Sequence, residues 1–148
     1  MTPDKLTDHL IFRMARVAHA AMYSVNTRLE EAGRLSGSLQ RILFHVSICP
    51  RISQGDLAAR LGHTRAAISR QVALLEEGGY LRRAPGHDRR QIILSLTPAG
   101  TKEMEQALDI FLPVLDERLA LLSAQERSRL QDLVAKLAPE TGPCSAPK

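Results

Sequence analysis

The sequence predicts a mainly α-helical fold with one small β-hairpin. Apolar residues recur at steps of three and four over most of the 148-residue chain, which is the period of amphipathic helices. One segment differs, because Ile92, Leu94 and Leu96 fall on alternate positions after a turn-forming Pro85–Gly86 pair, as in a hairpin. Hydrophobic residues make up 44% of the chain and charged residues 24%, which is average for a globular protein. A chain of this size is expected to form one domain, or one domain with extensions.

Two helices are expected at the start of the chain. Apolar residues spaced for one helix face run from Leu6 to Leu29, and Gly33 is a suitable residue for ending that helix. A second helix is expected to open at residues 36–38. It must end before Pro50, because the residue that precedes a proline is pushed out of the helical region.

A pair of shorter helices joined by a tight turn comes next. Ser53 can cap a short helix in which Asp56 lies at the positive end of the helix dipole. Gly62 makes the turn, and Thr64 can cap a further helix that ends at glycines 78–79. The inward face of this further helix carries Ile68, Val72 and Leu75. With the hairpin that follows, the two helices form a winged helix-turn-helix lobe.

Long helices are also expected at the end of the chain. Thr97 is a suitable cap for one of them, and Ser123 with Glu126 forms a capping box for the last. The tail over residues 139–148 is rich in proline and is expected to be disordered. The predicted organisation is therefore a winged lobe over residues 36–97 and a helical dimerisation region over residues 1–35 and 98–138. Long apolar stripes in the latter need a partner surface.

The composition excludes several classes of protein. No uncharged stretch approaches the ~18 apolar residues that span a membrane, and the start of the chain lacks the pattern of a signal peptide. Two cysteines without CxxC spacing exclude a disulfide scaffold and a zinc finger. Aromatic residues are only 3% of the chain, which weighs against proteins that stack single-stranded bases. We expect a cytoplasmic protein with no membrane contact, metal or other cofactor.

Positive charge is concentrated in the predicted winged lobe. The net charge is +4, and the segment from Arg51 to Arg90 accounts for it with eight arginines against four acids. The planar guanidinium of arginine suits phosphates and guanine edges better than the ammonium of lysine does. The segment therefore favours double-stranded DNA as a partner. A solvated surface on which the charges cluster by chance is the alternative interpretation.

The second helix of a helix-turn-helix enters the DNA major groove, so its outward face is the candidate reading surface. A helical wheel with Ile68 inward predicts that face. The outward, flanking and first-turn residues include Arg65, Ala66, Ser69 and Arg70. These side chains are small, polar or cationic, as close approach to base edges requires.

The tip of the hairpin carries Asp88, Arg89 and Arg90. Two guanidinium groups at a wing tip suit a narrow minor groove, whose negative potential is enhanced. We expect Asp88 to pair with Arg90 and hold the shape of the tip. An ordinary turn acid in a solvated hairpin is the alternative.

In their spaced combination, these segments resemble the MarR family of bacterial transcription regulators. The matching segments are residues 53–61 (SQGDLAARL), 68–76 (ISRQVALLE), 79–83 (GYLRR) and 88–100 (DRRQIILSLTPAG). With the flanking helices the resemblance covers about residues 6 to 138.

The resemblance implies an obligate homodimer whose outer helices interlock above two winged lobes, and repression is the family's commoner mode. A two-fold dimer implies a pseudo-palindromic operator with half-sites about 10 bp apart. We expect DNA contacts from Thr64, Arg65, Ala66, Ser69, Arg70, Arg83, Asp88, Arg89 and Arg90.

Many members of the family release DNA when a small molecule, often an aromatic acid, binds. Arg41 and His45, at i and i+4 on one helix, could hold the carboxylate of such an effector. Met14 and Phe111 could line the pocket. A solvated pair and plain core residues are the alternatives. The oxidation-sensing branch relies on a cysteine early in the first helix, which this sequence lacks, and Cys49 at a helix C-terminus is not expected to be redox-active.

Two other functions remain open from the sequence. One is a winged-helix module that binds an acidic protein, although the aromatic anchors of protein interfaces are scarce here. The other is an enzyme, for which GxSxG, P-loop and GxGxxG motifs are all absent. Neither Cys49 nor His45 has an evident orienting partner.

Overall fold

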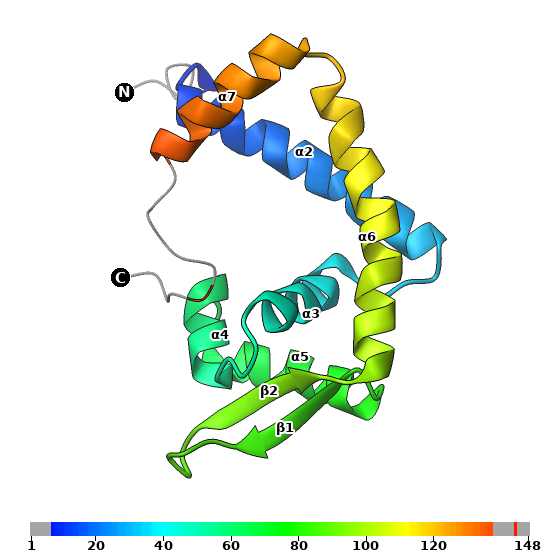
Figure 1. Cartoon of the computed structure of the whole chain (residues 1–148), viewed down its shortest axis with the longest axis vertical. Coiled ribbons are helices and arrows are strands. Elements are labelled where there is room, and N and C mark those ends of the chain that lie inside the picture. Colours follow the sequence, from blue (N-terminus) through cyan, green and yellow to red (C-terminus); the bar gives the residue numbers. More distant parts are fainter. Residues whose placement is uncertain (1–6, 138–143, 145–148) are drawn as a thin grey trace.

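The computed structural model describes residues 7–137 and 144. Two long helical arms stand above a smaller lobe that ends in a β-hairpin (Figure 1). The mainly α-helical prediction with one small hairpin is therefore confirmed. The described elements are α2 (Leu10–Glu31), α3 (Gly37–Ile48), α4 (Gln54–Leu61), α5 (Arg65–Glu77), β1 (Leu81–Pro85), β2 (Ile92–Leu96), α6 (Pro98–Leu119) and α7 (Ala124–Leu137).

The lobe has its own apolar core, to which α3, α4, α5 and both strands contribute. The three residues predicted to face inward on α5 are completely buried, which confirms the helical wheel. The largest fully buried side chains of this core are Ile42, Leu43, Leu57, Ile68, Leu75, Leu81 and Leu94.

α4 and α5 begin at the residues that the sequence predicts as caps, Ser53 and Thr64. The Ser53 hydroxyl oxygen accepts from the Asp56 backbone N–H at 3.0 Å and donates to the Asp56 carboxylate at 2.6 Å. Thr64 accepts from the Ala67 backbone N–H at 3.2 Å. Gly62 separates the two helices in the left-handed region, with φ of 65°, which costs glycine little. The turn of the helix-turn-helix is thus set by its own residues.

The hairpin is antiparallel and pairs Leu81 with Leu96 at one end and Pro85 with Ile92 at the other. Its second strand also forms an isolated bridge between Ile93 and Ser53. Since Ser53 caps α4, this bridge ties the start of α4 to the wing.

The arms share a second, smaller cluster of buried residues. Val25 and Leu29 of α2 pack with Ala107 and Val114 of α6. α2 begins at Leu10, because the His9 ring nitrogen accepts a hydrogen bond from the Ile11 backbone N–H and caps it.

Residues outside the described part carry two further predictions, the start at residue 6 and most of the expected tail. No helix among residues 7–137 is long and apolar enough to cross a membrane.

The base of α6 is attached to the lobe. Thr97 caps α6, and its hydroxyl donates to the Gly79 carbonyl at 2.5 Å. Gly100 lies so close to the Tyr80 carbonyl oxygen that a Cβ there would overlap it. Met104 packs against the lobe core. The first turns of α6 therefore belong with the lobe, although the sequence assigns them to the helical region that starts at residue 98.

Gly100→Ala is expected to lower the free energy of unfolding by about 1–3 kcal/mol through overpacking against Tyr80. Gly55→Ala is the matched control, since it also lies in the first turn of a helix and a Cβ there meets only the Ser53 hydroxyl at 3.8 Å. That control should be neutral or stabilising by up to about 1 kcal/mol. Urea denaturation at a fixed protein concentration measures both. Equal stabilities would mean that the base of α6 can shift away from the lobe.

Candidate nucleic-acid interface

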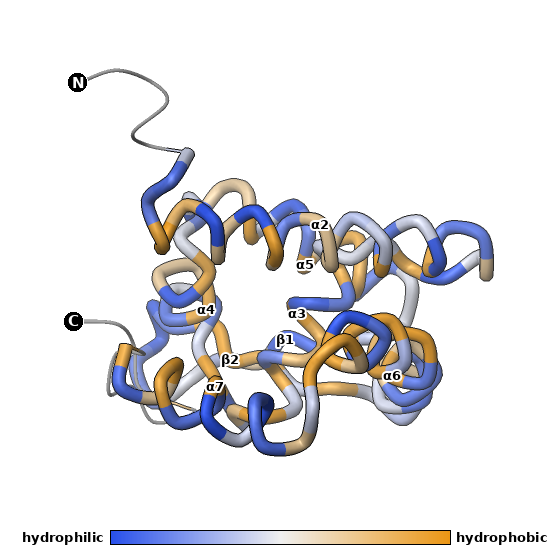
Figure 2. Tube along the Cα trace, turned by 90° about the horizontal axis from the view of Figure 1, so that it is seen from above, coloured by the Kyte–Doolittle hydropathy of each residue, from blue (hydrophilic) through white to orange (hydrophobic). Residues whose placement is uncertain are grey.

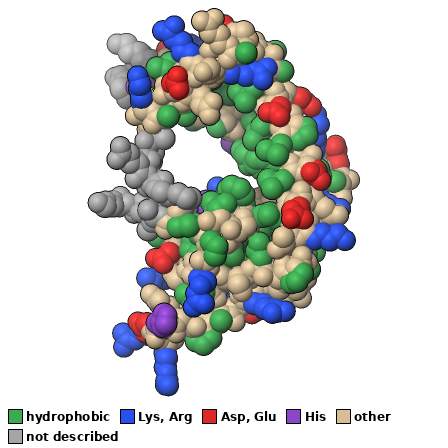
Figure 3. All heavy atoms as spheres, viewed as in Figure 1, with side chains coloured by type: hydrophobic (Ala, Val, Ile, Leu, Met, Phe, Trp, Pro, Cys, Tyr) green, Lys and Arg blue, Asp and Glu red, His purple; other side chains and the backbone are tan. Residues whose placement is uncertain are grey.

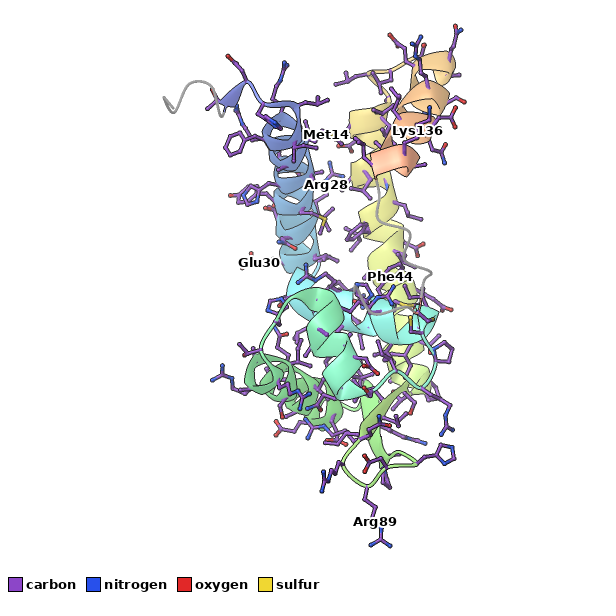
Figure 4. The ribbon with its side chains drawn as sticks, turned by 90° about the vertical axis from the view of Figure 1, so that its left-hand side faces the viewer. Met14, Arg28, Glu30, Phe44, Arg89 and Lys136 are labelled. Atoms are coloured by element: carbon purple, nitrogen blue, oxygen red, sulfur yellow. The ribbon has the colours of Figure 1, made fainter. Side chains whose placement is uncertain are left out.

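The exposed side of α5 and the hairpin tip form the end of the lobe farthest from the arms. Arg89 lies at this extreme, below the ribbon of the lobe (Figure 4). Because the buried stripe of α5 faces the core, its opposite side must face solvent. The residues predicted to read DNA from α5 are exposed except for Ser69, which is half-buried: Thr64, Arg65, Ala66, Ser69 and Arg70. The structure therefore brings these five residues together on one surface.

The hairpin tip is held by a single carboxylate. Asp88 accepts a hydrogen bond from the backbone N–H of Arg90 at 3.0 Å, and its backbone carbonyl accepts from the Gln91 N–H at 2.8 Å. The expected pairing of Asp88 with Arg90 thus occurs through the main chain, and the Arg90 guanidinium stays exposed. An aspartate that bonds the backbone two residues on is a common turn device. Asp88 therefore fixes the tip without neutralising its arginines.

A groove runs between the wing and the start of α4. It has a volume of about 340 Å³, and Arg65 and Arg90 both line it together with Gln54 and Gly55. Since Gln54 and Gly55 begin α4, the positive end of the α4 dipole lies at this groove. No pattern along the chain predicts this groove, because the bridge between Ser53 and Ile93 beside it joins positions forty residues apart.

Arg83 differs from the other predicted DNA contacts, because its guanidinium is engaged within the lobe. Its Nη2 donates to the Ser69 carbonyl oxygen on α5 at 2.9 Å, and its Nε lies 3.6 Å from the Glu76 carboxylate. Glu76 also accepts from the Arg83 backbone N–H at 3.3 Å. Arg83 therefore braces α5 against β1, and we assign it a positioning role.

The residues predicted for an effector do not gather at one place. Phe111 packs with the cluster shared by the two arms. Met14 lies on the upper part of α2, away from the lobe (Figure 4). Arg41, in contrast, donates from Nη2 to Nε2 of His63 at 2.8 Å, in the turn that precedes α5. The apolar and the cationic halves of the predicted pocket are thus separate in this chain.

His45 lies in a cationic environment beside Arg41. Burial lowers the pKa of His45, and the charges of Arg60 and Arg41 lower it further. Its Nδ1 atom is buried and has no hydrogen-bond partner among residues 7–137 and 144. Positive groups therefore converge between α3 and the helix-turn-helix.

The thiol of Cys49 is buried, and the Cys144 side chain lies beside it. Burial first, and then a hydrogen bond with Cys144, raises the pKa of Cys49. Cys144 also donates to the Ile48 carbonyl at 3.1 Å. Within the described part of the chain, no three His, Cys, Asp or Glu side chains lie close enough together to hold a metal ion.

Comparisons with known proteins point to one family. The model of the MarR family matches residues 41–91. The HTH-type transcriptional regulator BilQ of Clostridium symbiosum is 31% identical over 112 residues, which cover 75% of this chain and 77% of BilQ. The fold is similar to that of MepR from S. aureus in its complex with DNA, with a TM-score of 0.73 and 20% identity over 87% of this chain and 96% of MepR. It is also similar to PcaV from Streptomyces coelicolor in complex with its natural ligand, with a TM-score of 0.72 and 23% identity over 93% of this chain and 96% of PcaV.

Arg83→Ala is expected to lower the free energy of unfolding by about 1–2 kcal/mol, since it removes a charged donor from the Ser69 carbonyl. Backbone amides of α5 should then exchange with deuterium faster. Arg82→Ala is the matched control, because Arg82 is exposed on the same strand and should change stability by less than about 0.5 kcal/mol. Denaturation and hydrogen exchange measure the two effects. Unchanged exchange in α5 would contradict the positioning role.

Proposed function

This chain belongs to the MarR family of transcriptional regulators, and on that premise we propose that it binds a specific double-stranded DNA operator as a homodimer. We further propose that it represses transcription until a small molecule releases it. This role requires no catalytic step, and it places the protein's action in the cytoplasm, with the DNA.

The outward face of α5 carries the proposal. Ala66 and the half-buried Ser69 are small enough for the helix to approach base edges, and Arg70 extends from the same exposed face. An arginine there can donate two hydrogen bonds to guanine O6 and N7. The wing arginines Arg89 and Arg90 would reach the flanking minor groove or its phosphates. The fold shared with MepR, which was solved in complex with DNA, supports this arrangement.

The arms support the homodimer because their apolar residues are uncovered in a single chain. α7 contains no buried residue, and Leu133 and Leu137 are 49% and 59% exposed. On α2, Leu10 and Val17 are 65% and 59% exposed. Hydrophobic stretches recur along α2 and α7, which lie apart from each other (Figure 2). Exposed apolar surface of this extent marks an interface.

The surface area and shape of the chain agree with that interpretation. The chain exposes 10700 Å², whereas a compact monomer of its mass would expose about 7,500 Å². Hydrophobic side chains gather along the inner edge of the curve between arms and lobe (Figure 3). A hollow of about 750 Å³ lies between the first half of α2 and Arg118 of α6. A second copy of the chain, related by a two-fold axis, would fill this space and cover the stripes.

Selection of genomic fragments by the purified protein tests the proposal. We expect a recovered motif that is pseudo-palindromic, with half-site centres about 10 bp apart, and a dimer in sedimentation equilibrium at micromolar concentration. Binding should weaken steeply with salt. A monomer, or the absence of salt-dependent binding to any duplex, would contradict it and favour the alternative of a winged-helix module that binds an acidic protein.

Arg70→Ala and Arg90→Ala should weaken DNA binding in different ways. The Arg70 change is expected to cost about 1–3 kcal/mol on the selected operator and little on random duplex, because a base contact is lost. The Arg90 change should affect sites with A·T-rich flanks most and make the salt dependence shallower. Fluorescence anisotropy over a salt series measures both. An equal loss of affinity for operator and random DNA would show that Arg70 contacts a phosphate and not a base.

For the effector we propose a small, anionic, aromatic compound held near Arg41 and His45. The convergent charges of Arg41 and Arg60 beside His45 favour an anion there. Arg41 also contacts His63, directly before the Thr64 cap of α5, so an aromatic carboxylate bound at Arg41 would push against this turn and displace α5. The structural likeness to PcaV, solved with its natural ligand, supports a ligand-responsive function.

Arg41→Ala is expected to abolish release of the operator by aromatic carboxylates while the affinity for DNA is retained. Release is measured by anisotropy with a panel of benzoate derivatives. An unchanged dose response would remove Arg41 from the effector site.

A further inference from the structure

A buried carboxylate joins the lobe to the arms. Glu103 of α6 is only 7% exposed. One of its oxygens accepts from Gln40 Nε2 at 2.8 Å and from the Leu35 backbone N–H at 3.3 Å, and the other accepts from Arg34 Nη1 at 2.9 Å. The same Arg34 nitrogen donates to Gln106 Oε1 at 2.7 Å. Glu103 is thus hydrogen-bonded to Arg34 and Leu35 in the turn between α2 and α3 and to Gln40 in the first turn of α3.

This carboxylate lies where both connections between arms and lobe pass. One connection is the turn from α2 to α3, which contains Arg34 and Leu35, and the other is α6 itself (Figure 1). Close packing restricts the first connection further, since a Cβ on Gly37 would overlap the Asn26 side chain. Glu103 therefore holds the two connections to each other.

The carboxylate charge is what makes the joint stable. Arg34, Leu35 and Gln40 all donate hydrogen bonds to the carboxylate, and Arg34 also supplies the compensating positive charge. A buried carboxylate needs such donors, and donors left without an acceptor are costly. An amide keeps one oxygen and replaces the other with an NH2 group, so it would turn N–H donors either toward Arg34 or toward Gln40 and Leu35. At least one of the surrounding donors would then lose its acceptor, although glutamine has nearly the same shape as glutamate.

A change at this joint would be felt at the DNA. In the proposed dimer the arms fix the two-fold axis, so the angle between α6 and the lobe sets how far apart the two α5 helices lie. Neighbouring base pairs are about 3.4 Å apart along the duplex. A rotation of the lobe about the joint that moves α5 by about 3.4 Å along the duplex would therefore change the accepted spacing by one base pair.

We infer that Glu103 is a positioning residue that determines which half-site spacing the protein accepts. The inference rests on the proposed function, since it requires a dimer on a two-part operator. It assigns spacing specificity to a residue that touches neither DNA nor the other subunit.

Glu103→Gln tests this inference, with Glu117→Gln as the matched control. Glu117 also pairs with an arginine of α2, Arg28, at 2.9 Å, but this pair is exposed and lies within the arms. Dissociation constants are measured for the selected operator and for versions whose centre is lengthened or shortened by one and two base pairs. Thermal unfolding and sedimentation of each variant show that it is folded and dimeric.

The wild-type protein and Glu117→Gln should bind the altered spacings at least about tenfold more weakly than the natural one, the scale of a single mismatched base pair. Glu103→Gln should reduce the ratio of dissociation constants, altered over natural spacing, several-fold. We expect it to bind the altered spacings more tightly than the wild-type protein does, and to lose affinity for the natural spacing by less than this factor. Gln40→Met removes one donor without adding another, and it replaces Glu103→Gln should that variant fail to fold. It should change the ratio in the same direction.

The outcomes separate the inference from the proposed function. Absence of DNA binding by the wild-type protein overturns the proposed function. A folded, dimeric Glu103→Gln protein with the wild-type ratio overturns the inference alone. An equal loss of affinity at every spacing does so too, because it shows that Glu103 only stabilises the fold.

Discussion

The burial of one side of α5 is the constraint on which the interface depends. Ile68, Val72 and Leu75 are fully enclosed in the lobe core, and exposing each would cost roughly 1.5–3 kcal/mol. The helix therefore cannot rotate about its axis without a large loss of stability. Its small and cationic side chains are held outward before any DNA is present, so little ordering remains to be done on binding.

The same core organises the neighbouring parts of the lobe. The bridge between Ser53 and Ile93 joins the start of α4 to the wing, while Arg83 joins β1 to α5. α4, α5 and the wing are therefore linked by direct hydrogen bonds within one lobe. These links continue into α6 through Thr97 and Glu103, so hydrogen bonds connect the lobe to the arms.

Local features of the fold could be predicted from the sequence, and distant contacts could not. The caps at Ser53, Thr64 and Ser123 depend on bonds between residues three apart, so their patterns are visible in the chain. The exposed face of α5 follows from helical periodicity alone. The partners of Glu103 are separated from it by 63 to 69 positions, and no pattern along the chain indicates them. For the same reason the sequence does not reveal that Arg83 bonds the Ser69 carbonyl or that Arg41 contacts His63.

The last helix depends on its surroundings more than any other described element. α7 is 14 residues long and buries none of them in the single chain, and an isolated helix of that length is marginal in water. In the proposed dimer its order therefore comes from subunit contact. Folding of α7 and assembly then become one event, and the midpoint of thermal unfolding rises with protein concentration. A newly synthesised chain would finish folding only after it meets another, so the cellular abundance of this regulator sets how much of it is complete.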